Sequence, residues 1–320
     1  MTLIAPLDRL RLPVIGSPLF IISNPALVIA QCKAGIVGSF PALNARPQSQ
    51  LDEWLHQISE ELAAWNAAHP DSPAAPFAVN QIVHRSNPRL EEDMMTCAKW
   101  KVPIVITSLG AVPEVNDVVH GWGGITLHDI IHDRHARKAV DKGADGLIAV
   151  AAGAGGHAGT LSPFALTQEI RDWWDGPLVL SGAIASGRAI LAAQAMGADL
   201  AYIGSPFIAT QEANASAAYK QGIVESRAAD IVYSNLFTGI HGNYLRGSIE
   251  AAGLDPTALP QGDPSKMDFA SAIGGAKAWR DIWGAGQGIG AVRDVVPAAN
   301  YVARLSREYE DARRALMTAA

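Results

Sequence analysis

The sequence predicts a (β/α)8 barrel, the TIM barrel fold, with a mainly helical insert near the C-terminal end. Between residues 12 and 203, eight short apolar segments are each followed by a turn rich in small residues and an amphipathic segment. These apolar segments are continuous and do not alternate with polar residues, which is typical of strands buried on both faces of a parallel sheet. A barrel of this kind typically needs about 250 residues, and the chain has 320.

The sequence "PVIGSPLF" (13–20) follows the first expected strand, where a doubly wound dinucleotide-binding sheet would carry GxGxxG. Its presence there favours the barrel over that alternative. The expected strands cover residues 12–15, 35–39, 77–80, 103–107, 124–127, 146–150, 178–181 and 200–203.

Helix signals separate these strands. Ser23 or Asn24 before Pro25 predicts a capped helix start, and Gly35 stands just past the end of that helix. The next helix has an apolar face formed by Leu51, Leu55, Ile58, Leu62 and Trp65. The segment between the fourth and fifth strands has room for a short helix only.

Residues 216–290 lack this strand rhythm and are rich in alanine, glycine and polar residues, so they are expected to form the helical insert. Residues 1–215 and 291–320 are assigned to the barrel. The last segment regains strong helical periodicity and is expected to pack back on the barrel.

Composition limits the classes of protein. Apolar residues make up 49 % of the chain and charged residues 18 %, which indicates a globular protein with a large core. A net charge of −6 without a basic run argues against nucleic acid or an anionic membrane surface as partner. Cys32 and Cys97 lack CxxC spacing, which argues against a disulfide framework or a cysteine metal site. With no membrane-length apolar stretch, we expect a soluble cytoplasmic protein.

Reactive residues of a barrel lie at the carboxyl ends of its strands. The sixth strand ends in "AAGAGGHAG" (151–159), which places His157 among small residues. The seventh and eighth strands end in Ser181-Gly182-Ala183 and Gly204-Ser205, where backbone N–H groups can converge on a phosphate. The sequence contains no GxxxxGK[ST] motif, so it does not indicate a site for a nucleoside triphosphate. A flat phosphorylated cofactor facing His157 is expected, the alternative being ordinary tight turns and a loop histidine.

Other polar residues have weaker signals. Asn80, Thr107, Ser108 and Asp129 end buried strands, where a bound ring system or a neighbouring loop could satisfy them. Three histidines have a spacing that superficially resembles metal ligation, but they would not share one helix face, so we expect solvated or capping histidines and no metal: His128, His132 and His135.

The insert offers two further groups. Trp283 and Gln287 could close one side of a site. His241, Asn243 and Arg246 are expected to cap insert helices, although contact with substrate is the alternative.

Together, these motifs resemble the nitronate monooxygenase (2-nitropropane dioxygenase) family of FMN-dependent TIM barrels with a helical insert. The resemblance runs through essentially the whole chain. It depends on the order of "PVIGSPLF" (13–20), "FAVN" (77–80), "AGGHAG" (154–159), "SGAIASGR" (181–188), "GADLAYIGSPF" (197–207) and "WGAGQG" (283–288).

The resemblance implies that His157 is the catalytic base and that the cofactor is FMN. It places Gly155 and Gly156 close to the flavin. The remaining implied flavin contacts are Pro18, Leu19, Phe20 and Asn80 at the ring, and Ser181, Gly182, Ala183, Gly204 and Ser205 at the phosphate.

Three positions depart from the family pattern. Ala183 replaces a frequent second glycine but would still offer its backbone N–H, and Leu19 replaces a usual methionine. Asp129 stands where one branch has a lysine near the pyrimidine side of the flavin. If it points inward, an aspartate there would disfavour negative charge on the reduced flavin.

The expected activity is the oxidation of nitronates or nitroalkanes by dioxygen to a carbonyl compound and nitrite. The alternatives are an NAD(P)H-dependent quinone or enoyl reductase on the same FMN barrel, and a barrel that binds a ligand without catalysis. The oligomeric state is left open between a monomer and a homodimer.

Overall fold

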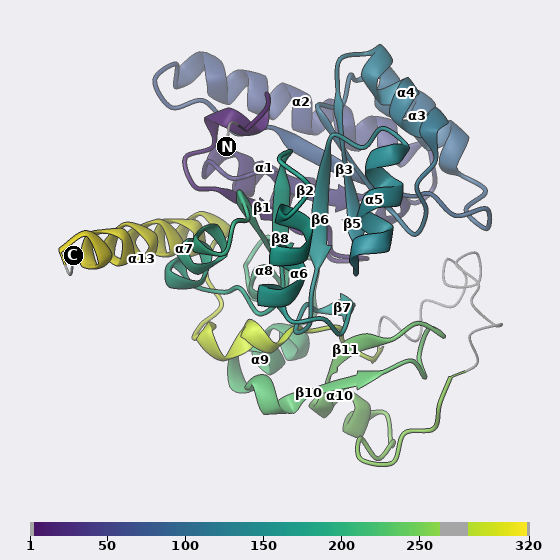
Figure 1. Cartoon of the computed structure of the whole chain (residues 1–320), viewed down its shortest axis with the longest axis vertical. Coiled ribbons are helices and arrows are strands. Elements are labelled where there is room, and N and C mark those ends of the chain that lie inside the picture. The colour runs from purple at the N-terminus through teal and green to yellow at the C-terminus, as the bar shows by residue number, and fades with distance from the viewer. Residues whose placement is uncertain (1–2, 263–280, 319–320) are drawn as a thin grey trace.

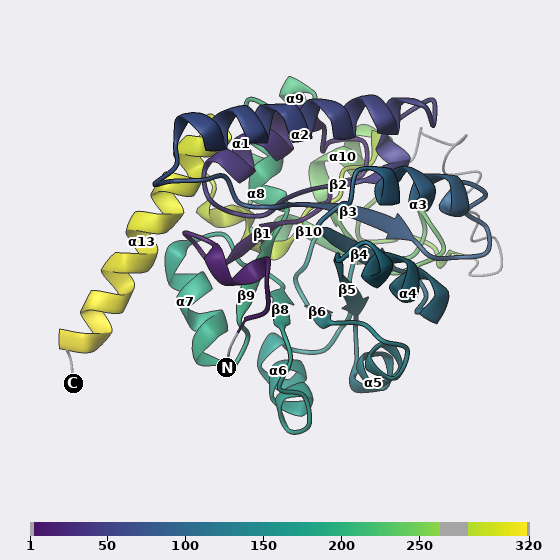
Figure 2. The same cartoon turned by 90° about the horizontal axis from the view of Figure 1, so that it is seen from above.

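The computed structural model describes residues 3–262 and 281–318. Eight parallel strands form one sheet in the order β1-β9-β8-β6-β5-β4-β3-β2. A parallel bridge between Ile15 and Val37 joins the first and last strands of this order and closes the ring. Helices surround the strands on the outside (Figures 1 and 2). The TIM barrel prediction is confirmed.

The strands of the barrel overlap all eight predicted segments. They are β1 (Val14–Gly16), β2 (Gly38–Pro41), β3 (Phe77–Ile82), β4 (Ile104–Ser108), β5 (Ile125–Ile130), β6 (Gly146–Val150), β8 (Leu178–Ser181) and β9 (Leu200–Ile203). The helices are α1 (Pro25–Lys33), α2 (Gln50–Ala68), α3 (Leu90–Lys99), α4 (Pro113–Gly121), α5 (Asp133–Asp141), α6 (Pro163–Arg171), α7 (Gly187–Ala195), α8 (Ser205–Ile208) and α13 (Ala298–Thr318), with short 3₁₀ helices η1 (Leu7–Arg9) and η2 (Ala42–Asn44).

Local sequence explains where these helices begin and which face they bury. The Asn24 side chain accepts a hydrogen bond from the Leu27 N–H and caps α1, whose first residue is Pro25. Helix α2 buries four of its five predicted apolar side chains: Leu51, Leu55, Ile58 and Leu62. Helix α4 is short, as expected.

Apolar side chains fill the barrel interior. Ile15, Ile104, Leu127 and Ile148 belong to one buried cluster that Leu7 of η1 also joins. The chain's N-terminal end and the strands' carboxyl ends lie on opposite sides of the barrel (Figure 1). The interior is therefore packed with side chains, and a ligand site has to lie above it.

The C-terminal helix takes the position of the eighth barrel helix. Helix α8 has only four residues, whereas α13 has 21 and contacts α7 and α1. A Cβ at Gly187 would lie 2.1 Å from the Tyr309 backbone nitrogen, so glycine allows α7 and α13 to approach backbone to backbone. The expectation that the last segment packs back on the barrel is confirmed.

The described part of the segment between α8 and α13 lies beyond the carboxyl ends of the barrel strands (Figure 1). It contains α9 (Ala217–Glu225), the 3₁₀ helix η3 (Ala228–Asp230), β10 (Ile231–Ser234), β11 (Gly242–Leu245), α10 (Arg246–Ala251) and the 3₁₀ helix η5 (Gln287–Ala291). Residues 263–280 of the predicted insert lie outside the described residues.

The insert also contains strands that the sequence did not predict. β10, β11 and the two-residue β7 (Gly156–His157) form a small antiparallel sheet. In residues 3–262 and 281–318, no helix is long and apolar enough to span a bilayer.

Candidate active site

A cavity of about 630 Å³ opens at the carboxyl ends of the barrel strands. Its lining includes a residue at or just after each barrel strand: Ser17, Pro41, Asn80, Ser108, Asp129, Val150, Ser181 and Tyr202. The cavity is also lined by all the residues for which a catalytic or cofactor-binding role was predicted: Pro18, Leu19, Phe20, Asn80, Asp129, Gly155, Gly156, His157, Ser181, Gly182, Ala183, Gly204 and Ser205. Their shared location is a property of the fold, while their individual roles stay predictions.

The loop that carries His157 is held by the insert. Gly156 and His157 pair with Asn243 and Gly242 of β11. The Asn243 side chain donates a hydrogen bond of 2.6 Å to the Ala154 carbonyl and is buried. The expectation that Asn243 caps an insert helix is therefore wrong, because its amide is used to fix this loop. A two-residue strand has no periodicity, so sequence reasoning missed it.

The glycines of this loop serve two different purposes. A Cβ at Gly155 would lie 2.7 Å from Ser205 Oγ and 2.8 Å from the Gly286 nitrogen, so this position is needed for packing against the returning insert. Gly156 has a φ of +67° and nothing within 4 Å of its Cβ position. Both glycines were expected close to the flavin, and of the two only Gly156 has open space at its Cβ position.

The His157 ring is positioned by Thr238. His157 Nε2 lies 2.9 Å from Thr238 Oγ1, and that hydroxyl donates to the Ile240 carbonyl at 3.0 Å. With the hydroxyl proton directed at the Ile240 carbonyl, the ring nitrogen that would donate to Thr238 Oγ1 is Nε2. Burial lowers the pKa of His157 to about 4, so the ring is neutral at pH 7 and able to accept a proton.

Three polar side chains from the neighbouring strands β3, β4 and β5 form a hydrogen-bonded chain along one wall of the cavity. Asn80 Nδ2 donates to Ser108 Oγ at 2.8 Å, and Ser108 Oγ donates to Asp129 Oδ2 at 2.6 Å. Asp129 Oδ1 is buried and has no hydrogen-bond partner within the part of the chain that the structure describes. Burial raises the pKa of Asp129 to about 7, although the Ser108 hydrogen bond opposes this shift. Asp129 thus points inward.

The three histidines in and after β5 differ from one another. His128 is buried and lines the cavity, and its Nδ1 lies 2.6 Å from Thr107 Oγ1. The interpretation of this residue as a solvated or capping histidine is therefore wrong. Burial lowers its pKa to about 4. His132 caps α5, and its ring lies 3.6 Å from that of His135. His135 and Lys138 reach the cavity from α5.

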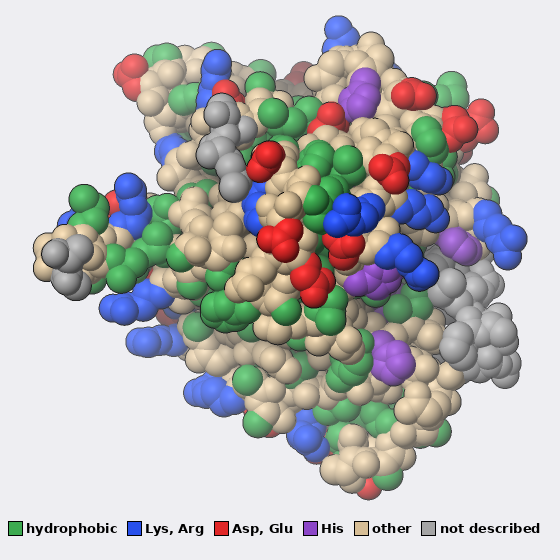
Figure 3. Space-filling view, in the orientation of Figure 1, with side chains coloured by type: hydrophobic (Ala, Val, Ile, Leu, Met, Phe, Trp, Pro, Cys, Tyr) green, Lys and Arg blue, Asp and Glu red, His purple; other side chains and the backbone are tan. Residues whose placement is uncertain are grey.

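Acidic and basic side chains are interspersed on the surface of α5 and α6 (Figure 3). On that face they do not form a single basic patch.

Of the two turns predicted for phosphate, the one at 181–183 has an unusual backbone. Gly182 has a φ of +140° and Ala183 a φ of +55°. The Ala183 N–H donates to the Gly153 carbonyl at 3.3 Å, so the expectation that it is offered to a ligand is wrong in this conformation. Ser205 Oγ accepts a hydrogen bond of 2.8 Å from the Gly286 N–H.

The turn after β1 is fixed by Asn44. The Ile21 N–H donates to Asn44 Oδ1 at 2.8 Å, and Asn44 Nδ2 donates to the Leu19 carbonyl at 2.9 Å. The Arg46 guanidinium lies 5.2 Å from the centre of the Phe20 ring. These contacts hold Leu19 and Phe20 at the cavity wall.

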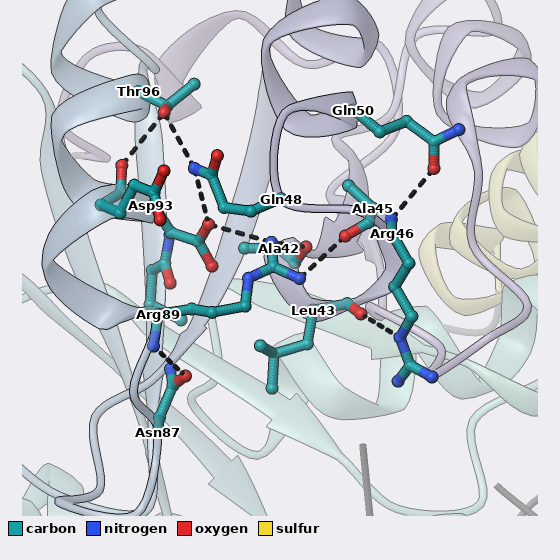
Figure 4. A network of polar contacts seen from close by, with 12 residues as sticks. Ala42, Leu43, Ala45, Arg46, Gln48, Gln50, Asn87, Arg89, Asp93 and Thr96 are labelled. Atoms are coloured by element: carbon teal, nitrogen blue, oxygen red, sulfur yellow. Dashed lines mark hydrogen bonds and ion pairs between the residues drawn. The ribbon is translucent and has the colours of Figure 1, made fainter. Parts of the chain in front are cut away.

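A polar network behind this wall supports η2 (Figure 4). Arg89 donates to the carbonyls of Ala42 and Ala45 at 3.2 and 2.8 Å and forms an ion pair of 2.9 Å with the fully buried side chain of Asp93. Gln48 also donates to Asp93, at 3.3 Å. The network was not predicted, because its partners are brought together by tertiary structure.

These features define a barrel enzyme with a cofactor-sized cavity and a neutral histidine at the carboxyl ends of its strands. Residues 4–308 match the model of the nitronate monooxygenase family. The chain therefore belongs to the nitronate monooxygenase family, and it is a flavin-dependent oxidoreductase.

Individual relatives agree with this assignment. A nitronate monooxygenase of Paraburkholderia phytofirmans is 26 % identical over 95 % of this chain and 93 % of its own length. The structure of a nitroalkane oxidase from Streptomyces ansochromogenes is 25 % identical, covers 97 % of this chain and 99 % of its own, and superposes with a TM-score of 0.77. FabK from Thermotoga maritima shares the fold at a TM-score of 0.80 and 22 % identity, over 98 % of this chain and 97 % of its own.

Proposed function

We propose that this enzyme binds FMN and oxidises nitronates, and neutral nitroalkanes after their deprotonation, to carbonyl compounds and nitrite with dioxygen as oxidant. The observation that carries the proposal is the state of His157. Its ring is neutral at pH 7, faces the cavity and is tied through Nε2 to Thr238. A neutral imidazole in this position is suited to remove a proton from the carbon next to a nitro group.

The cavity fits a flavin. Asp129 Oδ1, buried and without a hydrogen-bond partner in the described residues, is an atom that a bound polar ring edge would satisfy. Asn80 lies on the same side, while Pro18, Leu19 and Phe20 offer an apolar wall for the ring. The turns at 181–183 and 204–205 would hold the phosphate. When bound, FMN supplies the acceptor for the two electrons and passes them to dioxygen.

The protein's own residues supply binding and proton transfer. In this proposal the neutral His157 ring takes the proton of a nitroalkane, and the contact of Nε2 with Thr238 Oγ1 holds the ring in place during this step. A nitronate is already deprotonated and does not need the base. The positive Lys138 side chain lies at the cavity wall, where a negatively charged substrate would pass it.

The test compares a nitroalkane with its nitronate. The purified protein should show a flavin spectrum and release nitrite from both. His157→Asn should retain FMN and lose activity on the neutral nitroalkane far more than on the nitronate, by about 100-fold or more. An equal loss with both substrates would remove His157 from the role of base.

The same protein tests the alternative reactions. Rapid anaerobic bleaching of the flavin by NADH or NADPH would favour a quinone or enoyl reductase. Bleaching by propyl nitronate, with none by the nicotinamides, would support the proposed activity. A protein that stays colourless when offered FMN would indicate a barrel that binds another ligand.

A further inference from the structure

One carboxyl group in the cavity has no part in the proposed proton transfer. Asp129 lines the cavity, and its Oδ2 accepts a hydrogen bond from Ser108. Its Oδ1 is buried and makes no hydrogen bond within the described residues. A buried oxygen of this kind is costly unless a bound molecule or a proton occupies it.

We propose that Asp129 is the group that takes up a proton when the bound flavin is reduced. The inference depends on the proposed FMN site. In this step, the oxidised flavin and the Asp129 carboxylate together receive two electrons from the substrate carbon and two protons from solvent. The products are an anionic reduced flavin, which carries one of these protons, and a neutral Asp129 carboxylic acid.

Electrostatics at the cavity provides the reason. A negative charge that appears beside a buried carboxylate disfavours the ionised carboxylate and raises its pKa. Burial alone raises the pKa of Asp129 to about 7, so a further rise converts it from mostly ionised to mostly protonated in mildly alkaline solution. The hydrogen bond that Ser108 donates to the carboxylate lowers the pKa of Asp129 and so opposes the effect of burial.

The neighbouring titratable groups do not compensate this charge at neutral or mildly alkaline pH. Burial lowers the pKa of His128 and of His157 to about 4, so both rings are neutral. Burial and the charge of Asp129 raise the pKa of Tyr202, and burial raises the pKa of Tyr219, so both phenols are neutral as well. On α5, the pKa of His135 is lowered by burial and by nearby positive groups.

Among the residues that the structure describes, Lys138 is the remaining charged group at the cavity wall. It is exposed on α5, where water and salt screen its charge. Asp129 is therefore the cavity side chain whose protonation responds to charge on the ring.

The experiment measures the midpoint potential of the FMN-loaded protein against pH by spectroelectrochemistry, from about pH 6 to pH 9. Each proton taken up with two electrons adds about 30 mV per pH unit to the slope, since a tenfold change in a two-electron equilibrium is 29.6 mV. Above the pH at which Asp129 ionises in the oxidised protein, the midpoint potential of the wild type should fall by about 60 mV per pH unit. Asp129→Asn, which cannot take up a proton, should fall by about 30 mV per pH unit.

Two control variants sharpen the comparison. Asp141→Asn neutralises an exposed carboxylate at the end of α5 and should keep the wild-type slope. Ser108→Ala removes the hydrogen-bond donor that lowers the pKa of Asp129, so the pH range with the slope of about 60 mV should begin at a higher pH. A reduced-minus-oxidised infrared spectrum of the wild type should show the carbonyl band of a protonated carboxyl group, which requires no variant.

The outcomes separate this inference from the proposed function. With FMN bound, equal slopes in the wild type and Asp129→Asn, or no carboxyl band on reduction, would overturn the role of Asp129 and leave the proposed function standing. A protein that takes up no FMN would overturn both.

Discussion

Replacing Gly155 with alanine is expected to destabilise the protein by about 2–4 kcal/mol, as the sum of two costs. The new Cβ would lie 2.7 Å from Ser205 Oγ, 2.8 Å from the Gly286 nitrogen and 3.0 Å from the Ala285 carbonyl carbon. Ordinary contacts of this kind are about 3.5 Å or longer, and two of the three atoms belong to the backbone and cannot rotate away. Overpacking of this degree costs about 1–3 kcal/mol.

The second cost comes from a hydrogen bond. Moving residues 285–286 away would stretch the Gly286 N–H bond to Ser205 Oγ, now 2.8 Å long, which is worth about 1 kcal/mol. The assay is equilibrium unfolding in urea of the flavin-free protein, with FMN affinity measured in parallel.

Gly247→Ala is the matched control for this substitution. It lies in α10 with nothing within 4 Å of the new Cβ, so it should be neutral or stabilising by up to about 1 kcal/mol. If Gly155→Ala unfolds within about 0.5 kcal/mol of the wild type, the close packing of the His157 loop against the insert is refuted.

Three further predictions follow from the site. Thr238→Val should lower kcat/KM for a neutral nitroalkane about 10-fold, because the His157 tautomer is no longer fixed, and should spare the nitronate; an equal fall for both substrates would contradict this. Ala183→Gly should stabilise the protein by up to about 1 kcal/mol in urea unfolding, since a φ of +55° costs alanine more than glycine; a loss of stability would argue against it. In the flavin-free protein, Asp129→Asn should gain stability over the wild type as pH rises from about 4 to 7, by at most about 1.4 kcal/mol per pH unit. The reason is that a carboxyl group whose pKa is raised in the folded state stabilises that state only while it is protonated. A pH-independent difference in the free energy of unfolding would contradict the raised pKa.

The barrel could be predicted because its strands carry a strong local signal. Continuous apolar runs such as 146–150 have to be buried on both faces, and a parallel sheet surrounded by helices provides that burial. The strand ends then meet at one side of the ring, which is why Asn80 and Asp129 could be expected near His157 from their positions alone.

The supporting contacts could not be predicted, because they join segments far apart in the chain. Thr238 lies 81 residues from His157, and Asn243 lies 89 residues from Ala154. A threonine or an asparagine in a polar, glycine-containing segment has no pattern that names its partner. The same holds for Gly155, whose small size is required by atoms of the returning chain near Ala285.

The pairing of β7 with β11 has a consequence for how this enzyme could change its substrates. The insert borders the cavity, and it also holds the loop that carries His157, through the backbone pairing of β11 and through the Asn243 side chain. Exchanging the whole insert with that of a relative would therefore alter the place of the histidine together with the shape of the pocket. A graft that keeps β11 and varies the surrounding segments would change the shape of the pocket while His157 keeps its place.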